Sequence, residues 1–263
     1  MTVVVFGARG QVGRHVLQGL RDAGVDARGT SRGGPVVADL DRPETLPAAL
    51  DGATAAFLYA HPAGIGGFVA AARAAGVRRV ALLSSASVVR PDAGQNPIAQ
   101  RHRTVEEALE QSGLGWTFVR GGLFASNTIG LWAPSIRAAG KVRLAYPDAQ
   151  SAPVHEADLA AVAVAALVTG EHDGRAYTVH GPRSLSQADQ VAAIGAALQR
   201  PIAVEHVDAD TARAEMARSL PDAVADRLLR MWAAAGNAPA ATSPDLATRT
   251  FAEWAGDHAG DFR

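Results

Sequence analysis

Short apolar segments alternate along the first half of the chain with segments whose apolar positions recur at helical spacing. The expected strands are residues 2–6, 25–31, 35–38, 54–59, 79–83 and 116–119. The expected helices between them are residues 11–23, 43–50, 65–75 and 104–111. Such alternation is typical of βαβ units, in which parallel strands form one sheet with helices on its faces. We therefore expect an α/β protein with a Rossmann-type, doubly wound parallel sheet.

The pattern changes after about residue 120, where longer helical segments are separated by a few short strands. The expected helices are residues 160–167, 186–198, 208–218 and 223–235, and the expected strands lie around residues 142–144, 176–180 and 202–205. We interpret residues 1–263 as a single unit. Within it, residues 1–120 mainly form the sheet core, and residues 121–263 mainly form a small C-terminal α/β lobe with the last helices.

Composition narrows the classes of partner. The chain has 25 Lys and Arg residues against 26 Asp and Glu residues, and no basic run that would follow a nucleic-acid backbone. The absence of cysteine excludes disulfides and thiolate metal sites, and the eight histidines show no metal-ligand spacing. Apolar runs are too short to span a bilayer. We expect a cytoplasmic protein that binds no nucleic acid, membrane or metal.

Three glycines, Gly7, Gly10 and Gly13, follow the first expected strand and lead directly into a helix. Such a loop places free N–H groups and the positive end of a helix dipole together, which suits a diphosphate. The first strand, loop and helix therefore predict a dinucleotide site in residues 1–120. The expected contacts come from Gly7, Arg9, Gly10, Gln11, Val12 and Gly13.

The residues after the second expected strand distinguish between two dinucleotides. NAD sites usually carry an acidic residue there, which accepts hydrogen bonds from the ribose hydroxyls. This chain has Ser31 and Arg32 instead, and Asp26 lies too early. Together with Arg9, Arg32 would provide two guanidinium groups for a 2′-phosphate, which predicts NADP(H) as the cofactor. The alternative is that both arginines are solvated surface residues.

Seven motifs along the chain occur in an order and spacing typical of one family: GARGQVG at 7–13, TSR at 30–32, ADL at 38–40, RRVALLSSASV at 78–88, HRTVEEALEQSGLGWTFVRGGLFASN at 102–127, APVHEADLAAVA at 152–163 and GRAYTVHGPRSLSQ at 174–187. In these motifs the chain resembles the NmrA-like atypical short-chain dehydrogenases/reductases of the extended superfamily. The resemblance implies a Rossmann-fold cofactor domain and a small C-terminal lobe that closes over the nicotinamide.

Further site residues follow by position. The coenzyme contacts are expected from Ser31, Arg32, Asp39, Leu40, Leu58, Tyr59, Ala60, Ser84 and His102, and the substrate contacts from His61, Ser87, Phe124 and Asn127.

The chain departs from the family at its catalytic pair, a Tyr followed four residues later by a Lys. Ile98 and His102 stand at these two positions, so the usual proton donor is missing. The serine partner of that pair aligns with either Ser85 or Ala86. His102 and Ser85 remain the candidate catalytic residues.

The expected function is an NADPH-dependent oxidoreductase that reduces an aromatic ketone, a quinone or a similar small molecule by direct hydride transfer. Such an acceptor stabilises its own anion and therefore needs no tyrosine acid. The alternative is a non-catalytic NADP(H)-binding protein that senses redox state and regulates a partner. An isomerase or dehydratase that uses a bound cofactor transiently is a third reading. We expect a monomer or a homodimer.

Overall fold

The computed structural model describes residues 1–33, 36–218 and 220–263. These residues form two compact units. The first comprises Met1–Gly122 and Glu156–Val179, and the second comprises Leu123–His155 and His180–Arg263. The chain therefore returns to the first unit after residue 155. The expected division at residues 120 and 121 did not include this return.

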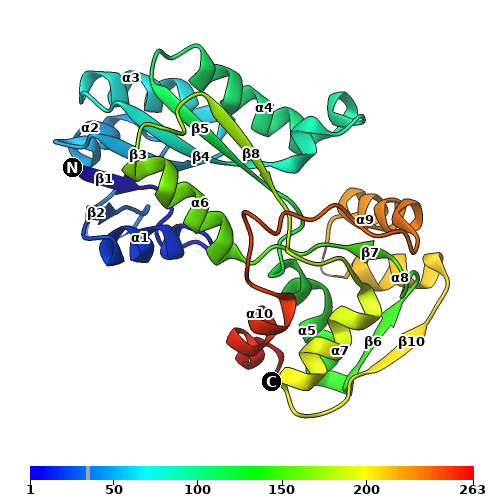
Figure 1. Cartoon of the computed structure of the whole chain (residues 1–263). Helices are drawn as coiled ribbons and strands as arrows, with labels where there is room; N and C mark the ends of the chain where they lie inside the picture. The colour runs from blue at the N-terminus through cyan, green and yellow to red at the C-terminus, as the bar shows by residue number, and fades with distance from the viewer. Residues whose placement is uncertain (34–35, 219) are drawn as a thin grey trace. The chain divides into compact units, whose positions relative to one another are not determined.

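The first unit contains a six-stranded sheet in which all the strands are parallel (Figure 1). Its strands are β1 (Thr2–Val5), β2 (Asp26–Gly29), β3 (Ala55–Tyr59), β4 (Arg79–Ser85), β5 (Gly115–Gly121) and β8 (Arg175–Val179). Their order across the sheet is β2-β1-β3-β4-β5-β8. The chain order reverses between β1 and β3, the kind of position at which open α/β sheets bind ligands. The expected Rossmann-type α/β fold is confirmed.

Two of the expected strands differ from the structure. The expected strand at 35–38 lies partly outside the described residues, and its remainder makes only an isolated bridge between Ser31 and Val37. The strand expected at 176–180, which we assigned to the small lobe, is β8 and pairs with β5 in the main sheet. The pattern of apolar residues predicts a strand but not the strand with which it pairs. The sequence alone therefore could not assign β8 to the main sheet.

Helices cover both faces of this sheet (Figure 1). They are α1 (Gly13–Asp22), α2 (Leu46–Leu50), α3 (Ile65–Ala74), α4 (Pro97–Glu110) and α6 (Glu156–Val168), with short 3₁₀ turns η1 (Pro43–Thr45), η2 (Pro62–Gly64), η3 (Ala86–Val89) and η4 (Ala93–Gln95). Helices α1 and α6 pack together on one face, and α2, α3 and α4 lie on the other. The core between sheet and helices includes Phe6 and Phe68, whose rings meet edge to face at 5.4 Å.

Helix α4 begins seven residues before the expected start at residue 104. Asn96 caps it, because its side-chain oxygen accepts a hydrogen bond from the backbone N–H of Ile98 at 3.0 Å, and Pro97 occupies the first turn. The polar first turns hid this start from the hydrophobic pattern. Ile98 and His102 consequently lie on a regular helix.

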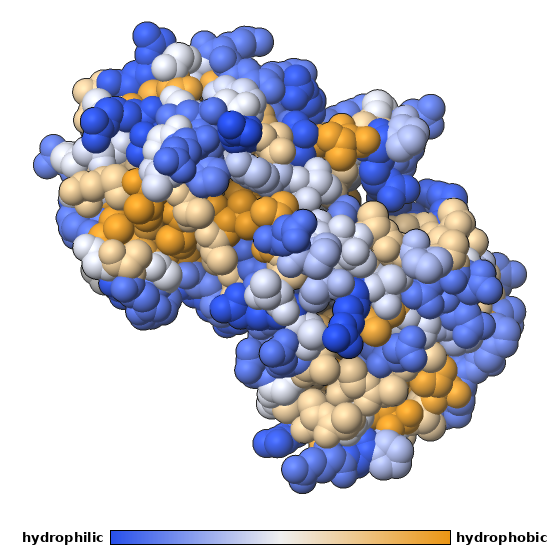
Figure 2. All heavy atoms as spheres, viewed as in Figure 1, coloured by the Kyte–Doolittle hydropathy of each residue, from blue (hydrophilic) through white to orange (hydrophobic). Residues whose placement is uncertain are grey.

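Helix α6 carries no polar side chain between Asp158 and Thr169. Ala161, Ala165 and Val168 nevertheless lie on its exposed side. Figure 2 shows the apolar surface that results over this helix. Despite this apolar character α6 spans only 13 residues, and among the described residues no helix is both long and apolar enough to cross a membrane.

The second unit combines helices with two small sheets. Its elements are α5 (Asn127–Ala139), β6 (Lys141–Leu144), β7 (Gln150–Ser151), β9 (Leu185–Ser186), α7 (Gln187–Ala197), β10 (Ala203–His206), α8 (Ala209–Met216), α9 (Asp222–Ala235), α10 (Phe251–Asp257) and η5 (Ala259–Phe262). Strands β6 and β10 pair in parallel, and β7 and β9 pair antiparallel. Helix α5, which contains Gly130 and Pro134, was not among the elements expected from the sequence.

Aromatic packing fixes the C-terminal helix within the second unit. Trp254 is fully buried, stacks on Phe251 at 5.2 Å and on His258 at 4.6 Å, and meets Phe262 edge to face. A capping box between Thr250 and Glu253 begins α10. This helix packs on α7, so the chain's last residues complete the core of this unit.

Candidate functional site

The glycine loop turns sharply between β1 and α1. Gly7 has a φ of +66°, a conformation that glycine adopts without strain, and its carbonyl accepts a hydrogen bond from the N–H of Gly10 at 2.8 Å. A Cβ on Gly13 would lie 2.2 Å from the Gly7 carbonyl oxygen, and one on Gly10 would lie 3.1 Å from it. The backbone is therefore packed too tightly at Gly13 for any side chain.

The start of α1 presents free backbone donors. The N–H groups of Val12 and Gly13 donate no hydrogen bond within the described part of the chain. They lie at the positive end of the helix dipole, so the loop fits a coenzyme diphosphate by its own geometry. The Val12 side chain is buried, which leaves only its backbone for this contact, whereas Gln11 is exposed.

Two cations stand beside this loop. Arg9 and Arg32 are exposed, and neither side chain makes a hydrogen bond or ion pair to any described residue. Unpaired guanidinium groups next to a diphosphate site fit a further phosphate group. Ser31, which precedes Arg32, is half-buried and donates its backbone N–H to the carbonyl of Val36 at 3.3 Å.

Tyr59 ends β3 and lies against the glycine loop. A Cβ on Gly7 would approach the Tyr59 ring at 3.1 Å. Partial burial raises the pKa of the Tyr59 hydroxyl. Arg32 opposes this rise in pKa, while the carboxylates of Asp39 and Asp41 add to it. The hydroxyl therefore stays protonated at neutral pH and lies within electrostatic reach of Arg32.

His61 does not stand alone at the end of β3. Its Nε2 lies 2.6 Å from Oδ1 of Asp41, and its ring is 6.3 Å from that of Tyr59. Asp39 is half-buried and accepts a hydrogen bond from the N–H of Asp41 at 3.1 Å. We expected His61 on the substrate side; the structure pairs it with Asp41 and places its ring near Tyr59, which the resemblance assigns to the coenzyme.

Several expected contact residues have little exposed side chain. Leu40 and Leu58 are 3% and 1% exposed and belong to the hydrophobic core, so only their backbones are available to a ligand. Ala60 is half-buried at the strand end. Strand position predicts that such residues lie near the site, but it does not tell whether their side chains face it.

The end of β4 carries three serines in different environments. Ser84 is 2% exposed, and its hydroxyl donates to Oε1 of Glu106 at 2.6 Å, so this side chain is not available for the nicotinamide ribose as we had expected. Ser85 and Ser87 are half-buried, and their hydroxyl oxygens lie 2.9 Å apart. The backbone N–H of Ser87 also donates to Ser85 Oγ at 3.2 Å.

The imidazole of His102 has a defined tautomer. Its Nδ1 lies 2.8 Å from the backbone carbonyl oxygen of Ile98, and a carbonyl only accepts, so Nδ1 carries the proton. In the neutral ring, Nε2 is then the free acceptor, and in the cation it is a proton donor. Ile98, one turn earlier on α4, is 45% exposed. His102 and Ser85 share no hydrogen bond.

The two remaining substrate candidates belong to the second unit. Phe124 is half-buried and forms an isolated β-bridge with Val154, and Asn127 is the exposed first residue of α5. Every other expected site residue lies in the first unit. Roles for Phe124 and Asn127 stay predictions.

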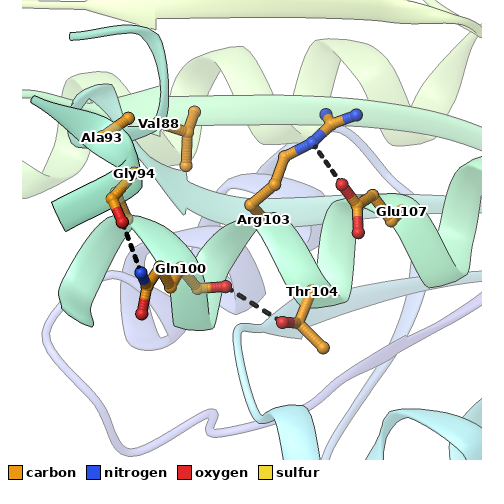
Figure 3. A pocket seen from close by; sticks show the side chains of 8 residues that line it. Val88, Ala93, Gly94, Gln100, Arg103, Thr104 and Glu107 are labelled. Atoms are coloured by element: carbon orange, nitrogen blue, oxygen red, sulfur yellow. Dashed lines mark hydrogen bonds and ion pairs between the residues drawn. The ribbon is translucent and has the colours of Figure 1, made fainter. Parts of the chain in front are cut away.

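The structure contains two features that our sequence analysis missed. The first is a buried ionic cluster around Glu106 and Arg120. The second is a cavity of about 300 Å³ along α4, which is drawn in Figure 3. Its lining residues are Val88, Ala93, Gly94, Ala99, Gln100, Arg103, Thr104 and Glu107.

The polar groups of this cavity bond to one another. Gln100 donates to the carbonyl of Gly94 at 2.6 Å, Thr104 donates to that of Gln100 at 3.0 Å, and Arg103 pairs with Glu107 at 3.0 Å. The cavity is therefore poorly suited to a charged ligand. Among the described residues, no three His, Asp or Glu side chains are placed to hold a metal ion.

Comparisons with known proteins agree with this site. Residues 7–169 match the family described as NAD(P)H-binding. The chain is 39% identical to (4-alkanoyl-5-oxo-2,5-dihydrofuran-3-yl)methyl phosphate reductase of Streptomyces griseus, over 99% of both chains. It is 31% identical to NAD(P)H azoreductase of Xenophilus azovorans, again over 99% of both chains.

A solved structure shows the same fold. The NADPH-dependent quinone oxidoreductase of Escherichia coli, complexed with NADPH, superposes with a TM-score of 0.78 at 23% identity, over 98% of this chain and 99% of that one. The family match covers the glycine loop, strands β2, β3, β4 and β5, and α6. The chain therefore belongs to the NAD(P)H-binding family, and its general activity is that of an NAD(P)H-dependent reductase.

Proposed function

We propose that this chain uses NADPH to reduce a small conjugated acceptor, such as a quinone, an aromatic ketone or an acyl butenolide, without a tyrosine acid. The observation that carries the proposal is the pairing of a complete coenzyme loop with an exposed Ile98 at the tyrosine position. The site can hold a hydride donor but lacks the residue that ordinary ketone reduction requires.

The choice of NADPH rests on Arg9 and Arg32. Both guanidinium groups are without protein partners in the described structure, and both belong to segments at the carboxyl end of the sheet. The 2′-phosphate would give these two donors a dianionic partner, which the ribose hydroxyls of NADH do not provide. Tyr59, protonated and close to Arg32, would supply a further hydrogen-bond donor.

The acceptor class follows from the missing acid. When bound, the coenzyme supplies a hydride, and the acceptor must then carry a negative charge until a proton arrives. The relative from Streptomyces griseus is named for a substrate whose ring double bond is conjugated with a lactone and an alkanoyl carbonyl. Hydride added to ring carbon 3 of such a compound leaves an enolate shared by both carbonyls. Because its two carbonyls share the negative charge, an acceptor of this kind lowers the barrier to hydride transfer without a protein acid.

His102 is the candidate source of the proton. Its Nδ1–H is held by the Ile98 carbonyl, which fixes the ring and leaves Nε2 to carry and release a proton. Ser85 would orient the acceptor oxygen through its hydroxyl, while Ser87 holds that hydroxyl in place. Ile98 would give the flat acceptor an apolar contact surface.

The test is an acceptor panel with purified protein, in which loss of the reduced-nicotinamide absorbance is followed. A naphthoquinone, an azo dye and an acyl butenolide phosphate form the conjugated set, and cyclohexanone is the control that requires an acid. We expect turnover of at least one conjugated acceptor and none of cyclohexanone. Equal turnover of cyclohexanone would contradict the proposal.

The same panel tests the alternative, a redox-sensing regulatory protein. That reading predicts tight binding of both oxidised and reduced coenzyme with no acceptor reduced. Calorimetric titration with each coenzyme form, run on the same sample, therefore separates an inactive preparation from a protein that binds the coenzyme without doing chemistry.

A further inference from the structure

The carboxylate of Glu106 is completely buried on the inner side of α4 and accepts hydrogen bonds from three other residues. The Ser84 hydroxyl donates at 2.6 Å. Arg120 approaches both oxygens, with Nε 2.9 Å from Oε1 and Nη2 2.7 Å from Oε2, which is a bidentate contact. Arg103 adds a longer contact of 3.3 Å to Oε2.

These contacts join one helix to two strands. Ser84 on β4 and Arg120 on β5 are direct neighbours across the sheet, and both side chains reach the same carboxylate on α4. Ser85 directly follows Ser84, and His102 lies one helical turn before Glu106. The cluster therefore links the backbone segments that carry both candidate catalytic residues.

Stability alone is a weak explanation for this arrangement. Burying a carboxylate and a guanidinium removes both from water, and well-packed apolar residues often replace such a pair without loss of stability. A bidentate pair differs from apolar packing because it is directional: the two parallel hydrogen bonds of the planar guanidinium restrict how its partner carboxylate can be placed. The cluster therefore contributes a fixed placement of α4 relative to β4 and β5 that apolar packing would not provide.

We infer that Glu106 is a positioning residue for the proposed reduction: through Ser84 and Arg120 it sets the placement of His102 on α4 relative to Ser85 at the end of β4. The inference rests on the proposed function for its effect on turnover. The effect of Glu106 on the structure at the end of β4 and on the His102 ring does not depend on the proposed function.

Glu107 provides a matched control on the same helix. It also pairs with Arg103, at 3.0 Å, but its side chain is 52% exposed, and it bonds to neither β4 nor β5. Substitution of Glu107 removes one carboxylate of the Arg103 cluster without touching the link to the sheet. The difference between Glu107→Gln and Glu106→Gln therefore isolates that link.

The experiment measures hydrogen exchange at the amides of residues 86–89, the ¹⁵N shifts of the His102 ring, NADPH affinity and kcat. For Glu106→Gln we expect exchange at 86–89 to rise by about tenfold or more, as local opening becomes easier. We expect kcat to fall by about 10²-fold, as for small misplacements of reacting groups. NADPH affinity should fall far less than kcat, because the glycine loop is untouched. Exchange in residues 7–13 should stay near wild type, as should every readout in Glu107→Gln.

A double variant separates positioning from folding. Glu106→Gln leaves the charge of Arg120 unpaired, so this variant is expected to lose thermal stability. Glu106→Gln with Arg120→Met removes both charges and should recover stability, while exchange at 86–89 and kcat stay impaired. Recovery of wild-type exchange and kcat in the double variant would overturn the inference. If the wild type reduces no acceptor, the proposed function fails. The hydrogen-exchange and ring-shift measurements still test whether Glu106 sets the placement of His102 relative to Ser85.

Discussion

Neutralising Arg9 and Arg32 should convert the protein from an NADPH-selective binder into one that does not distinguish the two coenzymes. The variants are Arg9→Gln, Arg32→Gln and the double substitution, each of which keeps a polar side chain of similar length. Neither guanidinium has a partner among the described residues, so its removal breaks no contact in the free protein. The expected effect is therefore confined to the bound state.

The magnitude follows from Coulomb's law. Two unit charges about 4 Å apart in water attract by about 1 kcal/mol, so a phosphate of charge near −2 gains about 2 kcal/mol from one guanidinium. Salt screening at an exposed site reduces this to about 1 kcal/mol, or roughly fivefold in Kd. The double variant should bind NADPH about 25-fold more weakly if the two effects add, and any departure from that product measures the coupling expected of two groups that share one phosphate.

Calorimetric titration with NADPH and with NADH at low and high salt is the assay. The NADPH affinity of the wild type should fall with salt more steeply than that of the double variant, and NADH affinity should change by less than about twofold in every variant. Equal weakening of both coenzymes would mean that the arginines support the loop rather than select the phosphate. No change in either coenzyme would leave both arginines as solvated surface residues.

Three further predictions concern single positions. Gly13→Ala places a Cβ 2.2 Å from the oxygen of the first loop glycine, so it should destabilise the fold by about 2 kcal/mol or more and abolish NADPH binding; an unshifted melting temperature would refute this. Ile98→Tyr combined with His102→Lys restores the family's acid pair and should raise reduction of acetophenone by about 10²-fold; an unchanged rate would place α4 away from the acceptor. Burial lowers the pKa of His180 below its usual 6.5, so the unfolded chain binds the proton first as pH falls. The contribution of His180 to the free energy of unfolding is therefore full above pH 6.5 and is lost as the pH falls from 6.5 to the lower pKa of the folded state. His180→Gln should flatten this dependence in denaturant titrations, and an identical pH profile would contradict it.

The local features of the coenzyme loop could be predicted from sequence because they depend on neighbours in the chain. Gly7, Gly10 and Gly13 lie within seven residues, and their conformations are set by the turn between β1 and α1. The same holds for Gly76 and Gly113, which end helices with φ near +77° and +76°. The spacing of residues along the chain therefore predicts local backbone geometry of this kind.

Contacts between distant segments were not predictable in this way. Glu106 sits in a run of charged residues that resembles a solvated helix face, and nothing in that run tells that Arg120 and Ser84 converge on it. The pairing of His61 with Asp41 likewise depends on how two loops meet beyond the strands. Such contacts require the sheet order, which a single sequence does not provide.

The assignment of β8 shows the same limit at the level of a whole element. Its sequence indicated a strand, but its partner, β5, was decided by the crossover through α6, which returns the chain to the first unit. Helix α5 was not among the expected elements, and Pro134 inside it lowers its helical propensity. Tertiary packing outweighs that local cost.

The central claim is that the bound coenzyme passes its hydride to a conjugated acceptor in this protein. The most direct measurement uses NADPH deuterated at the transferred position and an acyl butenolide phosphate, with the product examined by mass spectrometry and NMR. The account predicts one deuterium on ring carbon 3 for each coenzyme oxidised. Tight coenzyme binding with no label in any product would contradict it.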